Sequence, residues 1–561
     1  MGVGVESIPN GGVRRMWGQA KGVGAEFNGD HGQLTTLGPV MIVAIIAAIC
    51  WYTALPAHLA SWDAVQFALA LEHFDLGLHQ PHPPGYLAHV GLGAVLAATG
   101  MPTDRAIQVA SILAAALAIF ATGWFARRLN GPAAGLASAL ILATNPVLGY
   151  YAMSGESYCS EVLAAVLLAS IAMRSRLSST HGAVAALGLA WGLSGAFRPT
   201  VPILIGPLVL WSLLASARGR GLPHAARLMV TAIAATAAGL LSWLIPLVAS
   251  AGGLGRFLDL NKGLHLGMAA RGFSPLLGGE AASKSLELLM FSLVAVGSVA
   301  LPAAVATLII GRSRAVRAIG NGTFYLIWIV PALAWFLLTF FMKAGYALIL
   351  LPAVATGCGA LIVESFGKNR RLTALAVGAV AACQIALFVA PPAWVGGTAV
   401  FSLPSVDSEE ATVAASLAAV DRLSGGAPET VVVAIRSGGL KFRQAMYYLP
   451  SSDVLWLMDS GSTVGGRPGR QVCRSLERKV TCSGEDGFWL AQSLPQTARI
   501  ELPERASLIA WFLNPSQDFD EDLADAMPTF MVPLPAGGSF LATQLAPGPI
   551  KFVVQGYEFQ R

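Results

Sequence analysis

Long apolar runs alternate with short polar segments over about the first 390 residues of the chain. A helix needs about 20 mostly apolar residues to cross a bilayer, and most of the runs reach or approach that length. We expect spans at 38–56, 106–126, 132–150, 159–173, 182–197, 201–215, 226–249, 286–310, 323–342, 344–363 and 372–391. The pattern therefore predicts an α-helical polytopic membrane protein with about eleven transmembrane helices, a domain covering residues 38–391.

The pattern changes after residue 391. Short apolar runs at 431–435 and 454–458 are typical of buried strands, whereas 411–423 and 441–448 have helical periodicity. Strands and helices alternate in this part of the chain, which favours an α/β arrangement. We expect residues 392–561 to form a small soluble α/β domain, long enough to bury its own core.

Composition agrees with this division. The chain is 55% hydrophobic and only 12% charged, whereas soluble domains carry about 25% charged residues. Charged residues are sparse up to about residue 392 and ordinary after it. The net charge of +5 comes from short basic clusters between the apolar runs, which are topology signals and not a nucleic-acid-binding surface.

The basic clusters predict an orientation, because cytoplasmic loops of membrane proteins are enriched in Lys and Arg. They fall in alternate loops, at Arg127-Arg128, Arg174 with Arg176, Arg218 with Arg220 and Arg227, Arg312 with Arg314 and Arg317, and Lys368 with Arg370-Arg371. We therefore expect a cell (inner) membrane protein with a disordered cytoplasmic tail at 1–37. The other loops and residues 392–561 are expected to be periplasmic.

The first periplasmic loop, residues 57–105, contains an apolar stretch at 86–98 that is too short to span. Counting it as a span would also invert every later basic cluster. We expect a juxtamembrane helix there, lying in the outer interface.

Two of the six cysteines, Cys473 and Cys482, lie in the predicted soluble domain. Their spacing suits a disulfide across a short hairpin if the domain is outside the cytoplasm. The alternative is a pair of free thiols. The other four lie in apolar runs, where Cys usually acts as a small hydrophobic residue.

Three carboxylates lie in or beside the predicted periplasmic loops. Asp63 follows the first span, and Glu156 and Glu161 lie around the start of the fourth. In a chain that has few charges, a carboxylate at the membrane surface is a candidate for acid–base chemistry, or for holding a divalent cation such as Mg²⁺ or Mn²⁺. Helix capping is the structural alternative for Asp63 and Glu156.

His82 and two cations complete the candidate set. His82, in His82-Pro-Pro-Gly-Tyr86, is either a proton carrier or part of a rigid turn. Arg198 and Lys343 lie on the periplasmic side, against the charge rule, and are candidate phosphate ligands, with snorkelling as the alternative. Lys262 and His265, in a long Gly-rich periplasmic loop, are further candidate substrate ligands.

The pair Asp63-Ala-Val-Gln66-Phe67 and His82-Pro-Pro-Gly-Tyr86-Leu87 resembles the motifs of the glycosyltransferase-C superfamily, in particular its protein O-mannosyltransferase-like members. Those members have Asp-x-x-Glu-Phe after the first span and His-Pro-Pro-Gly-Tyr-Pro at the end of the first outward loop. Gln66 and Leu87 differ from that pattern. The acidic residue of the second outward loop is matched by Glu156 or Glu161.

The resemblance implies transfer of a sugar from a polyprenyl-phosphate carrier to an acceptor on the outer face. It suggests mannose as the sugar. It implies Asp63 as catalytic base, and we add Glu156 and His82 as catalytic candidates and Tyr86 of the second motif as a substrate ligand. The acceptor is left open between protein, lipid and glycan. The alternatives are a lipid-linked glycan enzyme similar to O-antigen ligases or polymerases, and a transporter or flippase.

Overall fold

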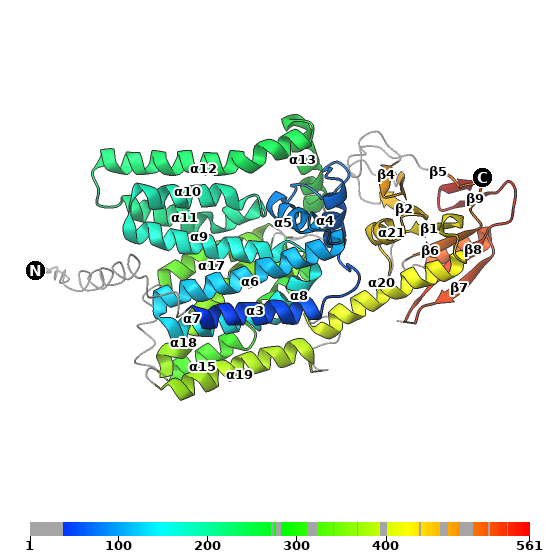
Figure 1. Cartoon of the computed structure of the whole chain (residues 1–561). Coiled ribbons are helices and arrows are strands. Elements are labelled where there is room, and N and C mark those ends of the chain that lie inside the picture. The colour runs from blue at the N-terminus through cyan, green and yellow to red at the C-terminus, as the bar shows by residue number, and fades with distance from the viewer. Residues whose placement is uncertain are drawn as a thin grey trace, which may run out of the picture.

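A computed structural model describes residues 37–561, except 271–273, 277–281, 311–321, 340, 367–368, 393–400, 437–438, 461–468, 483–496, 514–516 and 536. The tail predicted at 1–37 therefore lies outside the described residues, apart from its last position. Figure 1 shows a bundle of roughly parallel and antiparallel helices next to a β-rich domain, with the long helix α20 (Leu403–Ser424) leading from one to the other.

The helices of the bundle correspond roughly to the predicted spans, but the spans predicted at 132–150 and 286–310 are each divided into two helices. They are α3 (Gly38–Thr53), α6 (Thr103–Asn130), α7 (Pro132–Ala143), α8 (Pro146–Ser154), α9 (Tyr158–Ser178), α10 (His181–Ser194), α11 (Thr200–Ala217), α12 (Leu222–Ser250), α14 (Ala282–Gly297), α15 (Ala300–Ile310), α17 (Gly322–Leu338), η3 (Ala344–Leu350), α18 (Leu351–Phe366) and α19 (Arg370–Val389). Within the described chain, six helices are long and apolar enough to span a membrane, or up to eight if each of two bent pairs is one span. The predicted polytopic helical class is confirmed.

The bent pairs are α7–α8 and α14–α15, with angles of 59° and 61°. At the first bend, the side chain of Asn145 accepts hydrogen bonds from the backbone N–H groups of Val147 and Leu148 and so caps α8. Its amide nitrogen donates to the carbonyl of Val296, close to the second bend. One buried asparagine thus links the two breaks and directs α8 towards the site described below.

Two short helices lie at the end of the bundle that faces the β-rich domain (Figure 1). They are α4 (Trp62–Glu72) and α5 (Leu87–Ala97), and α13 (Leu254–Ala270) lies near them. The stretch expected at 86–98 is therefore an eleven-residue helix, as its length predicts.

The C-terminal domain is built on a seven-stranded sheet of order β4-β3-β2-β1-β6-β8-β7. The central strand β1 (Val431–Ile435) pairs in parallel with β2 (Asp453–Ser460) and β6 (Leu508–Phe512), and β3, β4, β7 and β8 add antiparallel edges. The edge strands are β3 (Gly469–Leu476), β4 (Lys479–Cys482), β7 (Thr529–Pro533) and β8 (Ser539–Gln544). A separate sheet joins β5 (Ala498–Glu501), β10 (Tyr557–Gln560) and β9 (Lys551–Val554).

Helices cover both faces of the large sheet, which explains why every residue of β1 is buried. Val431 and Val433 face a core shared with α20 and α21 (Phe442–Tyr448). Val432 and Ala434 face a second core shared with α22 (Gln517–Ala526) and the small sheet. The predicted α/β class is confirmed, and so is the hairpin disulfide, because Cys473 of β3 lies opposite Cys482 of β4 and is bonded to it.

Candidate active site

Asp63 lies in the first turn of α4, at the end of the bundle. Ser61 occupies the N-cap position of α4, but its hydroxyl does not cap the helix. The hydroxyl instead donates to Oε1 of Glu156. A carboxylate in a first helical turn is favoured by the helix dipole. This leaves the Asp63 side chain available for contacts outside its own helix.

Lys343 joins two of the three carboxylates predicted from sequence. Its ammonium donates to Oδ2 of Asp63 at 2.6 Å and to Oε2 of Glu156 at 3.1 Å. Asp63 and Lys343 are 280 positions apart in the chain, so only the tertiary fold brings them together. Lys343 comes directly before η3, and the backbone N–H of Gly345 in η3 donates to the hydroxyl of Tyr151.

The segment that carries Glu156 is fixed by buried polar contacts. Gly155 adopts a left-handed conformation, which ends α8. The Gly155 carbonyl accepts from the ring of His89, and the Glu156 carbonyl accepts from the Ser111 hydroxyl. These bonds hold the turn that aims Glu156 at Lys343.

His82 contacts α4 through Gln66 and Phe67. Its Nδ1 is 2.7 Å from Oε1 of Gln66 and its Nε2 is 3.0 Å from the hydroxyl of Tyr86. Because an amide oxygen only accepts, Nδ1 carries the proton and Nε2 accepts from Tyr86. The distance from Nδ1 to Oδ1 of Asp63 is 3.9 Å.

The His-Pro-Pro-Gly turn requires its glycine. Gly85 has φ of +108°, and a Cβ at this position would come within 2.5 Å of a methyl group of Leu247. A larger residue would therefore strain the backbone of the turn and displace the Leu247 side chain. The turn places Tyr86 at the start of α5, with its ring against Phe67 of α4.

Arg198 forms a second charged centre beside the first. Its Nη1 donates to Oε1 of Glu161 at 2.6 Å, and both side chains are nearly fully buried. The guanidinium also lies 4.5 Å from the ring centre of Tyr346 and 5.0 Å from that of Tyr158. A planar cation among aromatic faces, with one carboxylate partner, is suited to binding a phosphate.

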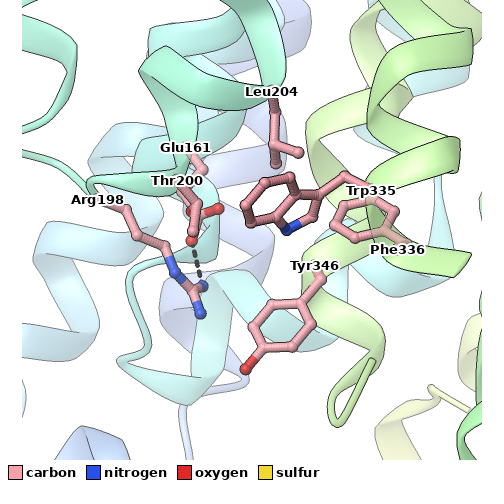
Figure 2. Close-up of a pocket in the computed structure, with 7 residues that line it drawn as sticks. All are labelled: Glu161, Arg198, Thr200, Leu204, Trp335, Phe336 and Tyr346. Atoms are coloured by element: carbon pink, nitrogen blue, oxygen red, sulfur yellow. Dashed lines mark hydrogen bonds and ion pairs between the residues drawn. The ribbon is translucent and has the colours of Figure 1, made fainter. Parts of the chain in front are cut away.

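A pocket opens next to Arg198 (Figure 2). Its lining combines this charged pair with apolar groups from α11 and α17, and it consists of Glu161, Arg198, Thr200, Leu204, Trp335, Phe336 and Tyr346. In Figure 2 the rings of Trp335, Phe336 and Tyr346 lie across from the Arg198–Glu161 pair. The pocket is small, and it places a charged pair next to aromatic and aliphatic side chains.

The pKa values of the central groups follow from burial and charge. Burial raises the pKa of the Asp63 carboxyl, but the Lys343 ammonium and the His82 imidazole outweigh it, and the pKa lies well below its ordinary value. Burial lowers the pKa of His82 to about 4, against the opposing effect of Asp63. At neutral pH the site thus contains an ionised Asp63, a charged Lys343 and a neutral His82.

A divalent cation fits this arrangement poorly. The Lys343 ammonium already occupies the position between Asp63 and Glu156, and Gln66 supplies an amide where the related motif has a carboxylate. Over the described ranges no group of three or more His, Cys, Asp or Glu side chains is placed to hold a metal ion.

The structure thus brings together seven of the nine candidates, namely Asp63, His82, Tyr86, Glu156, Glu161, Arg198 and Lys343. Lys262 is exposed on α13, and the side chain of His265 lies outside the described residues. Sequence reasoning missed Tyr158 and Tyr346, because tyrosines next to or inside apolar runs give no signal of their own. Their positions next to Glu156 and Lys343 were the only indication.

No family model matches the chain, and no curated protein matches its sequence. Solved structures do resemble it. The crystal structure of ArnT from Cupriavidus metallidurans in the apo state aligns with a TM-score of 0.56 and 14% identity, covering 91% of this chain and 99% of that chain. The fold is that of ArnT. ArnT bound to undecaprenyl phosphate aligns over the same shares with a TM-score of 0.56 and 13% identity.

The Archaeoglobus fulgidus oligosaccharyltransferase, in complex with zinc and sulfate, aligns at a TM-score of 0.35 and 14% identity, covering 73% of this chain and 61% of that chain. The glycosyltransferase-C fold expected from the Asp63 and His82 motifs is confirmed by the ArnT alignment.

Proposed function

We propose that the chain is a membrane glycosyltransferase that moves a sugar from a polyprenyl-phosphate carrier to an acceptor on the periplasmic face of the inner membrane. The contact between Asp63 and Lys343, beside the Arg198 pocket, carries this proposal. A base and two cations converge where a phosphate-linked sugar would meet an incoming hydroxyl or amine. The shared fold with ArnT, one structure of which is bound to undecaprenyl phosphate, supports the choice of donor.

The reaction is a direct displacement at the anomeric carbon. The acceptor oxygen or nitrogen forms a bond to that carbon, and the bond from the carbon to the phosphate oxygen breaks. The acceptor proton passes to Asp63, and the polyprenyl phosphate leaves with its charge balanced by Lys343 and Arg198. His82 remains neutral and, through Gln66 and Tyr86, orients the turn that borders Asp63.

Donor binding would also make Asp63 a better base. In the absence of donor, Lys343 lowers the pKa of Asp63 and weakens its basicity. A donor phosphate would compete with Asp63 for the Lys343 ammonium. When Lys343 interacts less with Asp63, the effect of burial raises the pKa of Asp63 again. Proton abstraction is then favoured only when the phosphate is in place.

Transfer can be measured with the full-length protein in nanodiscs. The donors are undecaprenyl phosphates carrying mannose or another hexose, and release of undecaprenyl phosphate is the readout, with mass spectrometry of the product to identify the acceptor. We expect at least one donor to be cleaved by the wild type and Asp63→Asn to reduce the rate by at least 100-fold without loss of the folded protein. Asp407→Asn, an exposed carboxylate on α20, is the matched control. Full activity of Asp63→Asn would refute the assignment.

A further inference from the structure

Side chains of the C-terminal domain bind the backbone directly before the helix that carries Asp63. Nε2 of Gln444 in α21 donates to the carbonyls of Leu59 and Ala60, at 3.1 and 2.8 Å. Nζ of Lys441 donates to the same Ala60 carbonyl at 3.0 Å. The backbone N–H of Leu59 donates to the hydroxyl of Tyr448 at 2.8 Å. Three backbone groups of a two-residue segment are thus satisfied by one helix about 385 positions later in the chain.

Apolar packing makes the same connection. Ala64, Val65 and Ala68 of α4 are buried in one hydrophobic core with α20, α21 and β1 of the C-terminal domain. The ring of Trp62 lies 5.2 Å from that of Trp456 in β2. The helix α4 therefore belongs to the core of the C-terminal domain as much as to the bundle.

The helix α21 also binds the segment that follows α4 and the start of α6. The buried guanidinium of Arg443, next to Gln444 in α21, donates to the carbonyl of Leu78. The hydroxyl of Tyr447 accepts from the backbone N–H of Asp104, at the start of α6. The helix α21 thus contacts the loop before α4, the loop after it and the start of α6.

A short chain of contacts leads from Gln444 to the reacting groups. Gln444 fixes Ala60, the next residue Ser61 donates to Glu156, and Asp63 follows two positions later. We propose that Gln444 is a positioning residue for Asp63: the C-terminal domain sets the first turn of α4 and with it the placement of Asp63 against Lys343 and Glu156. This inference rests on the proposed transferase function for its kinetic part.

Small displacements in such a site have large effects on rate, since a misplacement of about 1 Å can cost on the order of 100-fold. Loss of the two bonds from Gln444 should therefore lower kcat by about 10- to 100-fold. The Arg198 pocket does not contain α4 residues, so KM for the donor should stay within about twofold.

Two variants separate positioning from local helix stability. Oε1 of Gln444 accepts from the backbone N–H of Lys441 in a capping arrangement at the start of α21. Gln444→Glu keeps an acceptor for that bond but has no donor for the carbonyls of Leu59 and Ala60. Gln444→Met removes both functions. If Gln444 only stabilised α21, Gln444→Glu would behave as wild type.

The test measures donor cleavage and hydrogen–deuterium exchange of the peptide covering 59–67 in the full-length protein in nanodiscs. We expect both variants to lower kcat with KM unchanged and to increase exchange of this peptide. Gln471→Met, a buried glutamine of β3 in the same domain, should change neither. Unchanged kcat or unchanged exchange in Gln444→Glu would overturn the proposal.

The two proposals can fail separately. If the wild type cleaves none of the donors, the transferase assignment fails, and exchange of 59–67 alone decides whether Gln444 fixes α4. If the wild type is active and Gln444→Glu retains its kcat, the positioning role fails and the transferase function stands.

Discussion

The Nζ atom of Lys343 lies 2.6 Å from Oδ2 of Asp63 and 3.1 Å from Oε2 of Glu156, so one cation is shared by two acids from distant parts of the chain. The cation that would receive a donor phosphate is the one that holds the base in its ionised form. Donor binding and base strength are thereby coupled through a single side chain.

Lys343→Met should alter the pH dependence of donor cleavage. In the wild type the pKa of Asp63 is below its ordinary value, so the base is ionised throughout the neutral range. Without Lys343 the effect of burial dominates and the pKa rises. Since the rate falls as the base is protonated, an acidic limb should move to higher pH, together with a loss in kcat/KM of at least 100-fold.

The exposed residue Lys262 provides the control for that measurement, and Lys262→Met should leave the profile unchanged. Superimposable pH profiles for Lys343→Met and the wild type would contradict the coupling.

Variants of the Arg198–Glu161 pair should distinguish an effect on stability from an effect on lipid binding. Arg198→Met leaves the buried Glu161 carboxylate without its partner, which costs about 3–5 kcal/mol for buried pairs. Combining Arg198→Met with Glu161→Gln removes both charges and should restore most of the stability. Both proteins should bind undecaprenyl phosphate at least tenfold more weakly than the wild type. Thermal unfolding and lipid binding in detergent measure the two effects, and tight binding by the stable double variant would exclude Arg198 as a phosphate ligand.

His82 should not titrate in the physiological range. Its pKa is lowered to about 4 by burial, so the ring is almost entirely neutral between pH 6 and pH 8. His82→Gln should lower kcat, by about tenfold through loss of the bonds to Gln66 and Tyr86, without changing the shape of the pH profile. An inflection near pH 6.5 that disappears in His82→Gln would show that the ring does carry a proton during turnover.

The disulfide gives a test of orientation. Cys473 and Cys482 should be oxidised in cells, because we propose that the C-terminal domain is periplasmic, while Cys50, Cys159, Cys358 and Cys383 remain thiols. Replacing both with Ser should destabilise the domain by about 2–3 kcal/mol, as expected for closure of a short loop. Mass-shift labelling with and without reductant counts the thiols, and six reactive thiols before reduction would place the domain in the cytoplasm.

Much of the bundle could be predicted from the sequence because a membrane span is a local pattern. The run at 159–173 corresponds to α9, and the run at 344–363 corresponds to η3 and α18. The predicted bounds agree with the observed ones to within a few residues. The rarity of charges in the membrane part likewise singled out Asp63, Glu156 and Lys343 before their contact was visible.

What the sequence could not provide was pairing across long separations. Nothing in the local pattern shows that Gln444 binds the carbonyls before α4. The sequence around Gln444 has the pattern of an ordinary amphipathic helix. The aromatic neighbours of Arg198 were hidden for a related reason, because Tyr158 and Tyr346 continue apolar runs that are expected in lipid.

The shared core around Ala64, Val65 and Ala68 limits how the two domains could be exchanged between proteins of this fold. A chimaera that exchanged everything after residue 400 for the corresponding part of another protein would leave one side of α4 facing a foreign surface. A successful graft would have to transplant the stretch from Leu59 to Leu78 together with its partners in α21. The loop that contains α4 and the helix α21 would therefore have to be exchanged together.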